Sequence, residues 1–374
     1  MENKRPARHA IYRPLLSWYD KFGRHDLPWK QHKTPYAIWL SEIMLQQTQV
    51  ATVIPYFYRF IAAFPSMESL AKAELNQVLA LWSGLGYYAR ARNLHKAAQA
   101  IFLEFSGMFP ETLEALVCLP GIGRSTAGAI LAQSFNAFGV ILDGNVKRVL
   151  TRYLCLKPDV QIKQSAKQFE SQLWAYAEHF TPKLSLLHRI GDYTQAIMDL
   201  GATICTRTQP KCTQCPLQKT CQAQLTQTQA HYPVKPLKKI KPSRETQFLV
   251  LCSEPNPSAL PQILLSQRPS KGIWGGLWSF PELSMENPLE QALETLGVSK
   301  KCLAKASQQT LGKYTHIFTH FKLEYEAHVI ILKTKPAHCL ASQKTKWYNA
   351  LELSQIGLPS PVTKILNQVG FLRS

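Results

Sequence analysis

Apolar side chains recur at spacings of three and four along the first 225 residues, and the pattern breaks at proline and glycine. This is the period of amphipathic helices, so the sequence predicts a mostly helical region. The first long segment follows Thr34, which can cap a helix whose first residue is Pro35. The helical segments that we predict are 36–53, 70–81, 89–105, 112–118, 126–134, 146–154, 164–177 and 193–200.

The pattern changes after residue 245, where short β-rich runs alternate with helical segments. Runs at 247–252, 262–267 and 321–332 predict strands, whereas 288–296 and 362–369 predict helices. This mixture is typical of an α+β domain. Prolines and basic residues fill the stretch between the two regions. We therefore predict a multidomain chain with a helical domain at 1–225, a basic linker at 226–245 and an α+β domain at 246–374.

The chain carries a large excess of positive charge. Its 374 residues include 43 Lys and Arg against 24 Asp and Glu, a net charge of +19, and 45% of the residues are hydrophobic. This composition argues against disorder and favours a polyanionic partner, with nucleic acid first and an anionic membrane surface second. The basic linker is either part of that interface or only a solvated connector.

The expected compartment is cytoplasmic. The sequence has no run of 18 apolar residues and no secretory leader, so we expect it neither to span a membrane nor to be exported. Five of the nine cysteines are scattered singly, which suits a reducing environment.

The other four cysteines form the strongest chemical signal. Cys205, Cys212, Cys215 and Cys221 have the spacing C-x6-C-x2-C-x5-C. Four thiolates from one short loop match a single metal centre. Zinc sites usually have two closely spaced C-x2-C pairs, whereas this loop has only one, Cys212 and Cys215, which favours a [4Fe–4S] cluster over zinc. Zinc and a disulfide pair remain the competing interpretations, and a disulfide conflicts with a reducing compartment.

Two carboxyl groups stand out in the helical region. Glu42 lies past the first turn of its predicted helix, so neither a cap nor the helix dipole explains it. Apolar neighbours would desolvate it, raise its pKa and suit it to donate a proton near neutral pH. Asp143 precedes the helix at 146–154 and has the ordinary role of an N-cap. If both faced one cleft, an acid and an ionised stabiliser could cleave a glycosidic bond; otherwise Glu42 only reaches solvent and Asp143 only caps.

A Leu-Pro-Gly-Ile-Gly run at 119–123 lies between two predicted helices. Gly121 and Gly123 allow positive φ and a close approach of the backbone, and the next helix offers free N–H groups. Together they would cradle a DNA phosphate, although by itself such a run is equally a simple turn.

Three features occur together and in this order: the Leu-Pro-Gly-Ile-Gly run at 119–123, Asp143 and the four-cysteine loop. This combination resembles the endonuclease III superfamily of base-excision DNA glycosylases. Within that superfamily, LPW at 27–29, SEIMLQQTQ at 41–49, GLGYYAR at 84–90 and LDGNVKRV at 142–149 resemble the adenine DNA glycosylase (MutY) family. The resemblance runs from about Tyr12 to the C-terminus. It implies a helix-hairpin-helix glycosylase domain with a [4Fe–4S] cluster, followed by a Nudix-like domain.

The resemblance also implies an activity and a partner. The family hydrolyses the N-glycosidic bond of adenine mispaired with 8-oxoguanine or guanine in duplex DNA, after the adenine has been flipped into a pocket. We expect a monomer that works in the cytoplasm, at the nucleoid if the source is bacterial.

By the same resemblance, Glu42 matches the general acid that protonates adenine N7 and later activates water. Asp143 matches the carboxylate that stabilises the oxocarbenium-like sugar, and Asn145 follows as its hydrogen-bonding partner. The remaining matches are Gln47 and Tyr87, which wedge into the base stack around 8-oxoguanine, and Trp29, Leu45 and Gln195 in the adenine pocket.

Ser125 separates this chain from relatives that also cut the DNA strand. Those relatives carry a lysine near this position, whose amine attacks the sugar. With Ser125 among the substrate-binding residues, we expect a monofunctional hydrolytic glycosylase, with Lys147 as an adventitious amine. The alternatives are an endonuclease III-like pyrimidine glycosylase with lyase activity and a non-catalytic iron–sulfur DNA-binding protein.

The C-terminal domain resembles a Nudix module that has lost part of its acidic motif. When the Nudix signature is aligned from Gly276, Glu282 matches one of its positions. Two positions that are acidic in the signature are occupied by Gln291 and Thr295 in this chain. Without those ligands a hard cation should not bind, so we expect this domain to recognise 8-oxoguanine and not to hydrolyse. The loop that inspects 8-oxoguanine would be Phe318, Thr319 and His320, with Thr in place of the family's Ser.

Overall fold

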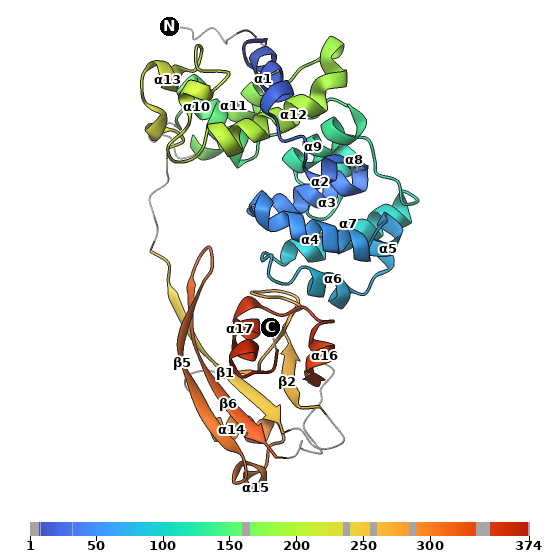
Figure 1. The fold of residues 1–374 in the computed structure, drawn as a ribbon, viewed down its shortest axis with the longest axis vertical. Coiled ribbons are helices and arrows are strands. Elements are labelled where there is room, and N and C mark those ends of the chain that lie inside the picture. The colour runs from blue at the N-terminus through green and yellow to red at the C-terminus, as the bar shows by residue number, and fades with distance from the viewer. Residues whose placement is uncertain are drawn as a thin grey trace. The chain divides into compact units, whose positions relative to one another are not determined.

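The computed structural model describes residues 7, 9–31, 33–158, 165–234, 240–254, 260–283, 289–333 and 345–372. Its backbone divides into two compact units. Unit 1 comprises 1–72 and 93–237, and unit 2 comprises 73–92 and 238–374; Figure 1 labels most of the elements of each. Of the described residues, none belongs to a helix long and apolar enough to cross a membrane.

The regular structure of unit 1 is helical in the part described, as the hydrophobic period predicts. The segments predicted at 89–105, 112–118, 126–134, 146–154 and 164–177 each coincide with a helix to within a few residues. The helices are α1 (His9–Phe22), α2 (Pro28–Gln31), α3 (Pro35–Leu45), α4 (Val50–Ala63), α5 (Met67–Lys72), α7 (Ala89–Glu104), which crosses the division between the units, α8 (Leu113–Cys118), α9 (Arg124–Phe135), α10 (Gly144–Leu154), α11 (Ser165–Phe180), α12 (Ile190–Asp199) and α13 (Gln222–Leu225).

Two predicted helices are each broken in two, and the prediction of continuous helices there was wrong. The segment 36–53 is interrupted at 46–49, where Gln47 adopts a left-handed φ of 58°. A residue in that region cannot continue a right-handed helix. The segment 70–81 is interrupted because Glu74 and Gln77 form a capping box that starts a new helix, α6 (Leu75–Leu81). The N-cap predicted at Thr34 is confirmed, since its hydroxyl accepts from the Ala37 N–H at 3.1 Å.

One buried core is shared by α1, α10, α11 and α12. It contains Leu15, Leu150, Phe180 and Ile197, one from each helix and each 1% exposed or less. Three of the four loop cysteines, Cys205, Cys215 and Cys221, pack against this core. The loop is therefore attached to the same hydrophobic centre that fixes α10 and α12.

Helix α9 is in contact with α3, α8 and α12 and is built largely from small residues. At Gly128 the extended segment 139–142 comes so close that a Cβ atom would stand 2.1 Å from the Val140 carbonyl oxygen. Near the start of the helix, Ser125 Oγ accepts the Leu142 N–H at 3.0 Å. These two contacts fix the segment that ends at Asp143 against α9.

Unit 2 contains a mixed sheet, which confirms the predicted α+β character. Its central order is β3-β2-β1-β6-β5, with β4 paired to β1 and β7 paired to β2. The strands β1 and β6 are parallel and the other pairs are antiparallel. The strands are β1 (Ser243–Ser253), β2 (Gln262–Gln267), β3 (Trp278–Ser279), β4 (Glu282–Leu283), β5 (Ser307–Ile317), β6 (Lys322–Leu332) and β7 (Thr345–Asn349); the helices besides α6 are α14 (Leu289–Thr295), α15 (Lys300–Leu303), α16 (Ala350–Leu353) and α17 (Ser360–Gln368).

Strand β1 occupies the centre of this sheet and is buried along most of its length. Leu249 and Leu251 join Leu264 from β2, Ile330 from β6 and Leu293 from α14 in one apolar cluster. The strand begins at Ser243, inside the stretch predicted as linker. The basic residues at 235–239, which we expect to belong to that linker, lie outside the described residues.

Candidate active site

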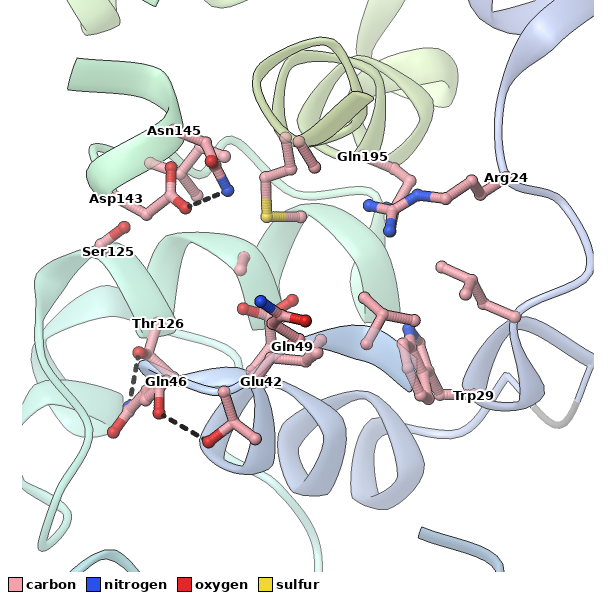
Figure 2. A pocket seen from close by; sticks show the side chains of 18 of the residues that line it. Arg24, Trp29, Glu42, Gln46, Gln49, Ser125, Thr126, Asp143, Asn145 and Gln195 are labelled. Carbon is pink, nitrogen blue, oxygen red and sulfur yellow. Dashed lines mark hydrogen bonds between the residues drawn. The ribbon is translucent and has the colours of Figure 1, made fainter. Parts of the chain in front are cut away.

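A cavity of about 650 Å³ lies in unit 1, with walls from α3, α9, α12 and the start of α10. It brings together residues that the sequence analysis singled out separately. In the view of Figure 2, Asp143 and Asn145 lie on one side, Arg24 and Trp29 on the other, and Glu42 between them. The predicted residues that line the cavity are Trp29, Glu42, Leu45, Ser125, Asp143, Asn145 and Gln195.

Glu42 is the acidic side chain of α3 in this cavity. Its pKa is raised from 4.5 to about 7, mainly because burial removes water from the charged form, with a smaller contribution from the nearby charge of Asp143. A hydrogen bond from Gln133 acts in the opposite direction. The sequence-based expectation of a desolvated carboxyl group with a raised pKa is confirmed.

This raised pKa makes the stability of the fold depend on pH. Below pH 4.5 the carboxyl is neutral in both folded and unfolded chains, and between pH 4.5 and 7 only the unfolded chain releases the proton. The folded state therefore loses stability across this window, by about 3 kcal/mol in total. We predict that Glu42→Gln unfolds at a higher denaturant concentration than the wild type at pH 8 and shows little difference at pH 4.5. Equal midpoints at pH 8 would contradict the raised pKa.

Asp143 is placed for both roles that the sequence suggests, helix capping and charge stabilisation, because it caps α10 and also lines the cavity. Its Oδ1 accepts the Val146 N–H at 2.8 Å, and its Oδ2 accepts the Asn145 side-chain N–H at 3.2 Å. Two N–H donors suit an ionised carboxylate. The capping role and a charge-stabilising role are therefore compatible in one side chain.

Asn145 connects Asp143 to the cysteine loop. Its Oδ1 accepts from Arg148 Nη2 at 2.7 Å, and Arg148 Nε donates to the Cys205 carbonyl at 2.7 Å. The π-helical turn Leu200–Ile204 leaves room for this arrangement only because residue 201 is glycine: a Cβ there would stand 2.5 Å from Asn145 Cβ. The position of the amide beside Asp143 is thus tied to the segment that leads into the loop.

The far end of the cavity holds a buried ion pair that the sequence analysis missed. Asp199 is 1% exposed and accepts from the backbone N–H, Nε and Nη2 of Arg24, the last at 2.6 Å. Gln195 Nε2 donates to Asp199 Oδ1 at 2.7 Å. The amide of Gln195 is therefore held in one orientation at the cavity wall. Arg24 and Asp199 are 175 residues apart, and neither has a sequence signal of its own.

The other predicted DNA-contact residues of unit 1 lie outside the cavity wall. Gln47 is exposed between α3 and α4. Lys147 forms a surface ion pair with Glu170 at 2.6 Å. In the hairpin, Gly121 has the expected positive φ of 79°, and a Cβ would meet Asn93 Cβ at 2.8 Å. Gly123 does not use this freedom: it is the N-cap of α9, with a φ of −89°.

The four loop cysteines are close enough to influence one another's charge. Burial, together with the smaller effect of the charges of Cys205, Cys212 and Cys221, raises the pKa of the Cys215 thiol to about 12. Arg152, which is 3% exposed, donates to Cys205 Sγ at 3.4 Å. Four closely spaced, partly exposed thiolates need compensating positive charge, which a metal centre provides. Within the described ranges, however, no three His, Cys, Asp or Glu side chains are gathered as for a single metal ion.

In unit 2 an exposed aromatic side chain stands on a strained loop. Tyr87 has a left-handed φ of 50° and is 46% exposed. Hydrogen bonds to the segment at Leu358 hold this loop in place, since Ser83 Oγ and Tyr88 Oη both donate to the Leu358 carbonyl at 3.0 Å. Arg92 Nη1 donates to the Gly275 carbonyl at 2.5 Å. An exposed ring on a fixed support is suited to stacking on a base.

The turn between β5 and β6 carries the other predicted recognition residues. Thr319 and His320 are exposed, with Thr319 Oγ1 3.2 Å from His320 Nδ1. The Phe318 ring stacks on the Phe321 ring at 4.5 Å. Glu282, the residue that matches the Nudix signature, forms an ion pair with Arg268 at 2.5 Å.

Comparisons with known proteins agree with this geometry. A family model described as "HhH-GPD superfamily base excision DNA repair protein" matches residues 40–179, and one described as "NUDIX domain" matches 259–368. A thermostable thymine-DNA glycosylase structure is 25% identical, has a TM-score of 0.51 and covers 59% of this chain and 97% of its own. Fold and cavity together define a base-excision DNA glycosylase of the helix-hairpin-helix superfamily.

The most informative relatives match almost the whole chain. An adenine DNA glycosylase of Buchnera aphidicola is 42% identical, with 96% of this chain and 97% of the relative covered. The Homo sapiens adenine DNA glycosylase is 35% identical, with 94% and 72% covered. This chain belongs to the adenine DNA glycosylase family, as its motifs predicted. It is a hydrolase of N-glycosyl bonds that removes adenine in base-excision repair.

Proposed function

We propose that this chain removes adenine from mispairs with 8-oxoguanine or guanine in duplex DNA, with Glu42 as proton donor and Asp143 as ionised partner. The observation that carries the proposal is that both carboxyl groups line one cavity in unlike environments. Glu42 stays protonated up to about pH 7, whereas Asp143 accepts two N–H hydrogen bonds. Such a division is what acid-catalysed cleavage of a glycosidic bond requires.

The reaction begins when adenine is flipped into the cavity. Glu42 donates its proton to N7, and the bond between the base and C1′ breaks with its electrons passing to the base. Asp143 stabilises the positive charge that develops on the sugar, and Asn145 holds Asp143 in place. The ionised Glu42 then takes a proton from the water that attacks C1′, which restores the acid and leaves free adenine and an abasic site.

The remaining wall residues recognise the base. Trp29 and Leu45 provide apolar surface for the ring. Gln195 donates to Asp199 through its amide nitrogen, which leaves its amide oxygen to accept from the amino group of adenine. The described residues that line the cavity include Ser125 and no lysine. We therefore propose a monofunctional glycosylase, since a lyase step needs an amine near the sugar.

The cysteine loop is proposed to hold a [4Fe–4S] cluster through Cys205, Cys212, Cys215 and Cys221. The donor set fits, because four free thiols lie on one loop with Arg152 donating to one of them. When bound, the cluster would supply a rigid cross-link for the loop. The chain's own contribution is the link from the Cys205 carbonyl through Arg148 to Asn145.

The other proposed contacts are with the duplex. Gln47 and Tyr87 would enter the base stack beside 8-oxoguanine, Gly121 and Gly123 would hold a phosphate at the hairpin, and the 318–320 turn would inspect 8-oxoguanine. We propose that the domains are 1–225 and 246–374 joined by 226–245, and that the protein acts as a monomer on DNA in the cytoplasm.

The proposed function is tested by single-turnover excision from matched duplexes. We expect rapid adenine release opposite 8-oxoguanine, slower release opposite guanine and almost none opposite thymine. We also expect no efficient borohydride trapping on duplexes with oxidised pyrimidines. Equal release from all three adenine pairs, or efficient trapping, would contradict the proposal.

A further inference from the structure

A glutamine on α9 contacts the carboxyl group of Glu42. Gln133 is 4% exposed and follows a buried run of small and apolar residues, 127–132. A buried amide without a partner is costly, so its position implies a hydrogen bond. Its Nε2 lies 3.1 Å from Glu42 Oε1.

The chemistry of the two groups fixes the direction of this bond. A carboxylate only accepts hydrogen bonds, so the amide nitrogen of Gln133 must face it. When Glu42 is neutral, Oε1 still accepts the N–H, and the acidic proton is therefore carried by Oε2. Gln133 thus determines which oxygen of the carboxyl group can donate.

Gln133 also lines a second cavity, whose lining does not include Glu42. This cavity is about 230 Å³ in volume, and Gln133 lines it together with His25, Lys30 and Asp192. Glu42 lines the larger cavity. The hydrogen bond between Gln133 and Glu42 therefore joins residues that line two different cavities.

We propose that Gln133 is a positioning residue for the reaction: its amide N–H fixes Oε1 of Glu42 so that Oε2 presents the proton to the base. The inference rests on the proposed role of Glu42 as acid. The same bond favours the ionised form and lowers the pKa of Glu42, partly offsetting the effect of burial. Its loss should therefore leave a carboxyl group that is both less ordered and a weaker acid.

Several charged groups on the elements around Glu42 are paired with another group or lie over a ring. Of the groups that face the cavity, Asp143 accepts two N–H bonds and Arg24 is paired with Asp199. On the helices packed against α3, Arg124 of α9 lies over the Trp174 ring and Arg59 of α4 over the Tyr56 ring, while Lys30 of α2 contacts the Tyr19 hydroxyl. Burial lowers the pKa of Lys30.

The test compares Gln133→Met, which keeps the volume and removes the donor, with Ser134→Ala on the same helix. The hydroxyl of Ser134 is buried and makes no hydrogen bond within the described part of the chain. Adenine release from an A:8-oxoguanine duplex is measured between pH 5 and 9, together with duplex affinity. The Glu42 pKa is followed independently by the ¹³C signal of its labelled carboxyl carbon.

We expect Gln133→Met to move the Glu42 pKa upward by roughly half to one pH unit and to slow release about ten-fold on the acidic side of the midpoint. Duplex affinity and the Ser134→Ala variant should be unchanged. An unchanged midpoint would overturn the inference, and so would a downward shift, since the amide oxygen would then be accepting the proton of Glu42. If the wild type releases no adenine from any duplex, the proposed function fails, but the carboxyl titration still tests the contact. Gln133→Leu replaces Gln133→Met if the latter does not fold.

Discussion

Replacement of Glu42 by Gln is expected to reduce adenine release from an A:8-oxoguanine duplex by about 10²- to 10⁴-fold, the contribution of a positioned general acid and base. The amide has nearly the same shape but cannot donate an acidic proton to the base. The expected measurement is the single-turnover rate at pH 7, with duplex affinity measured in parallel.

A matched control is Glu170→Gln, which removes an exposed carboxylate that pairs with Lys147 on the surface of unit 1. This variant should release adenine at the wild-type rate. If Glu42→Gln kept more than a tenth of the wild-type rate, the proton would have to come from another group. A parallel loss of duplex binding would instead indicate a structural role.

The second large effect is expected for Asp143→Asn, which should slow adenine release by roughly 10²- to 10³-fold. Asparagine caps a helix as well as aspartate does, so its side-chain oxygen can still accept the Val146 N–H. The substitution therefore removes the charge and keeps the cap. The unfolding midpoint should change little, while the rate falls.

Asp143→Ser gives an independent control, because serine also caps but carries no charge. Both variants should be slow and similarly stable. Wild-type rates in either one would mean that Asp143 has only the capping role that its position before α10 suggests.

The sequence could predict the parts of the site whose signals are local. Glu42 stands among apolar residues in one short helix, and Asp143 stands directly before another. The four-cysteine loop is recognisable from spacing alone. These features needed no knowledge of which segments meet in space.

The parts that were missed depend on segments far apart in the chain. Arg24 and Asp199 form their buried pair across 175 residues, and Gln133 reaches Glu42 across 91. Each is an ordinary polar residue in its own neighbourhood. Only the packing of α9 and α12 around the cavity gives them a role.

The two broken helices show a different limit. Residues 46–49 are all polar, and apolar residues resume at Val50, so the hydrophobic pattern alone did not distinguish a break from a polar helical turn. The left-handed φ of Gln47 that ends the helix is a property of one residue. The break before α6 did have a signal, since Glu74 and Gln77 have the spacing of a capping box. A search for caps as well as for period would have found it.

The central claim is that one protonated carboxyl group in the cavity drives adenine release. The most direct test is the pH dependence of release from an A:8-oxoguanine duplex, measured with protein in excess but below saturation so that groups of the free protein are reported. We predict a rate that falls as the pH rises through about 7, the pKa of Glu42. A rate that is constant or increases from pH 6 to 9 would contradict the account.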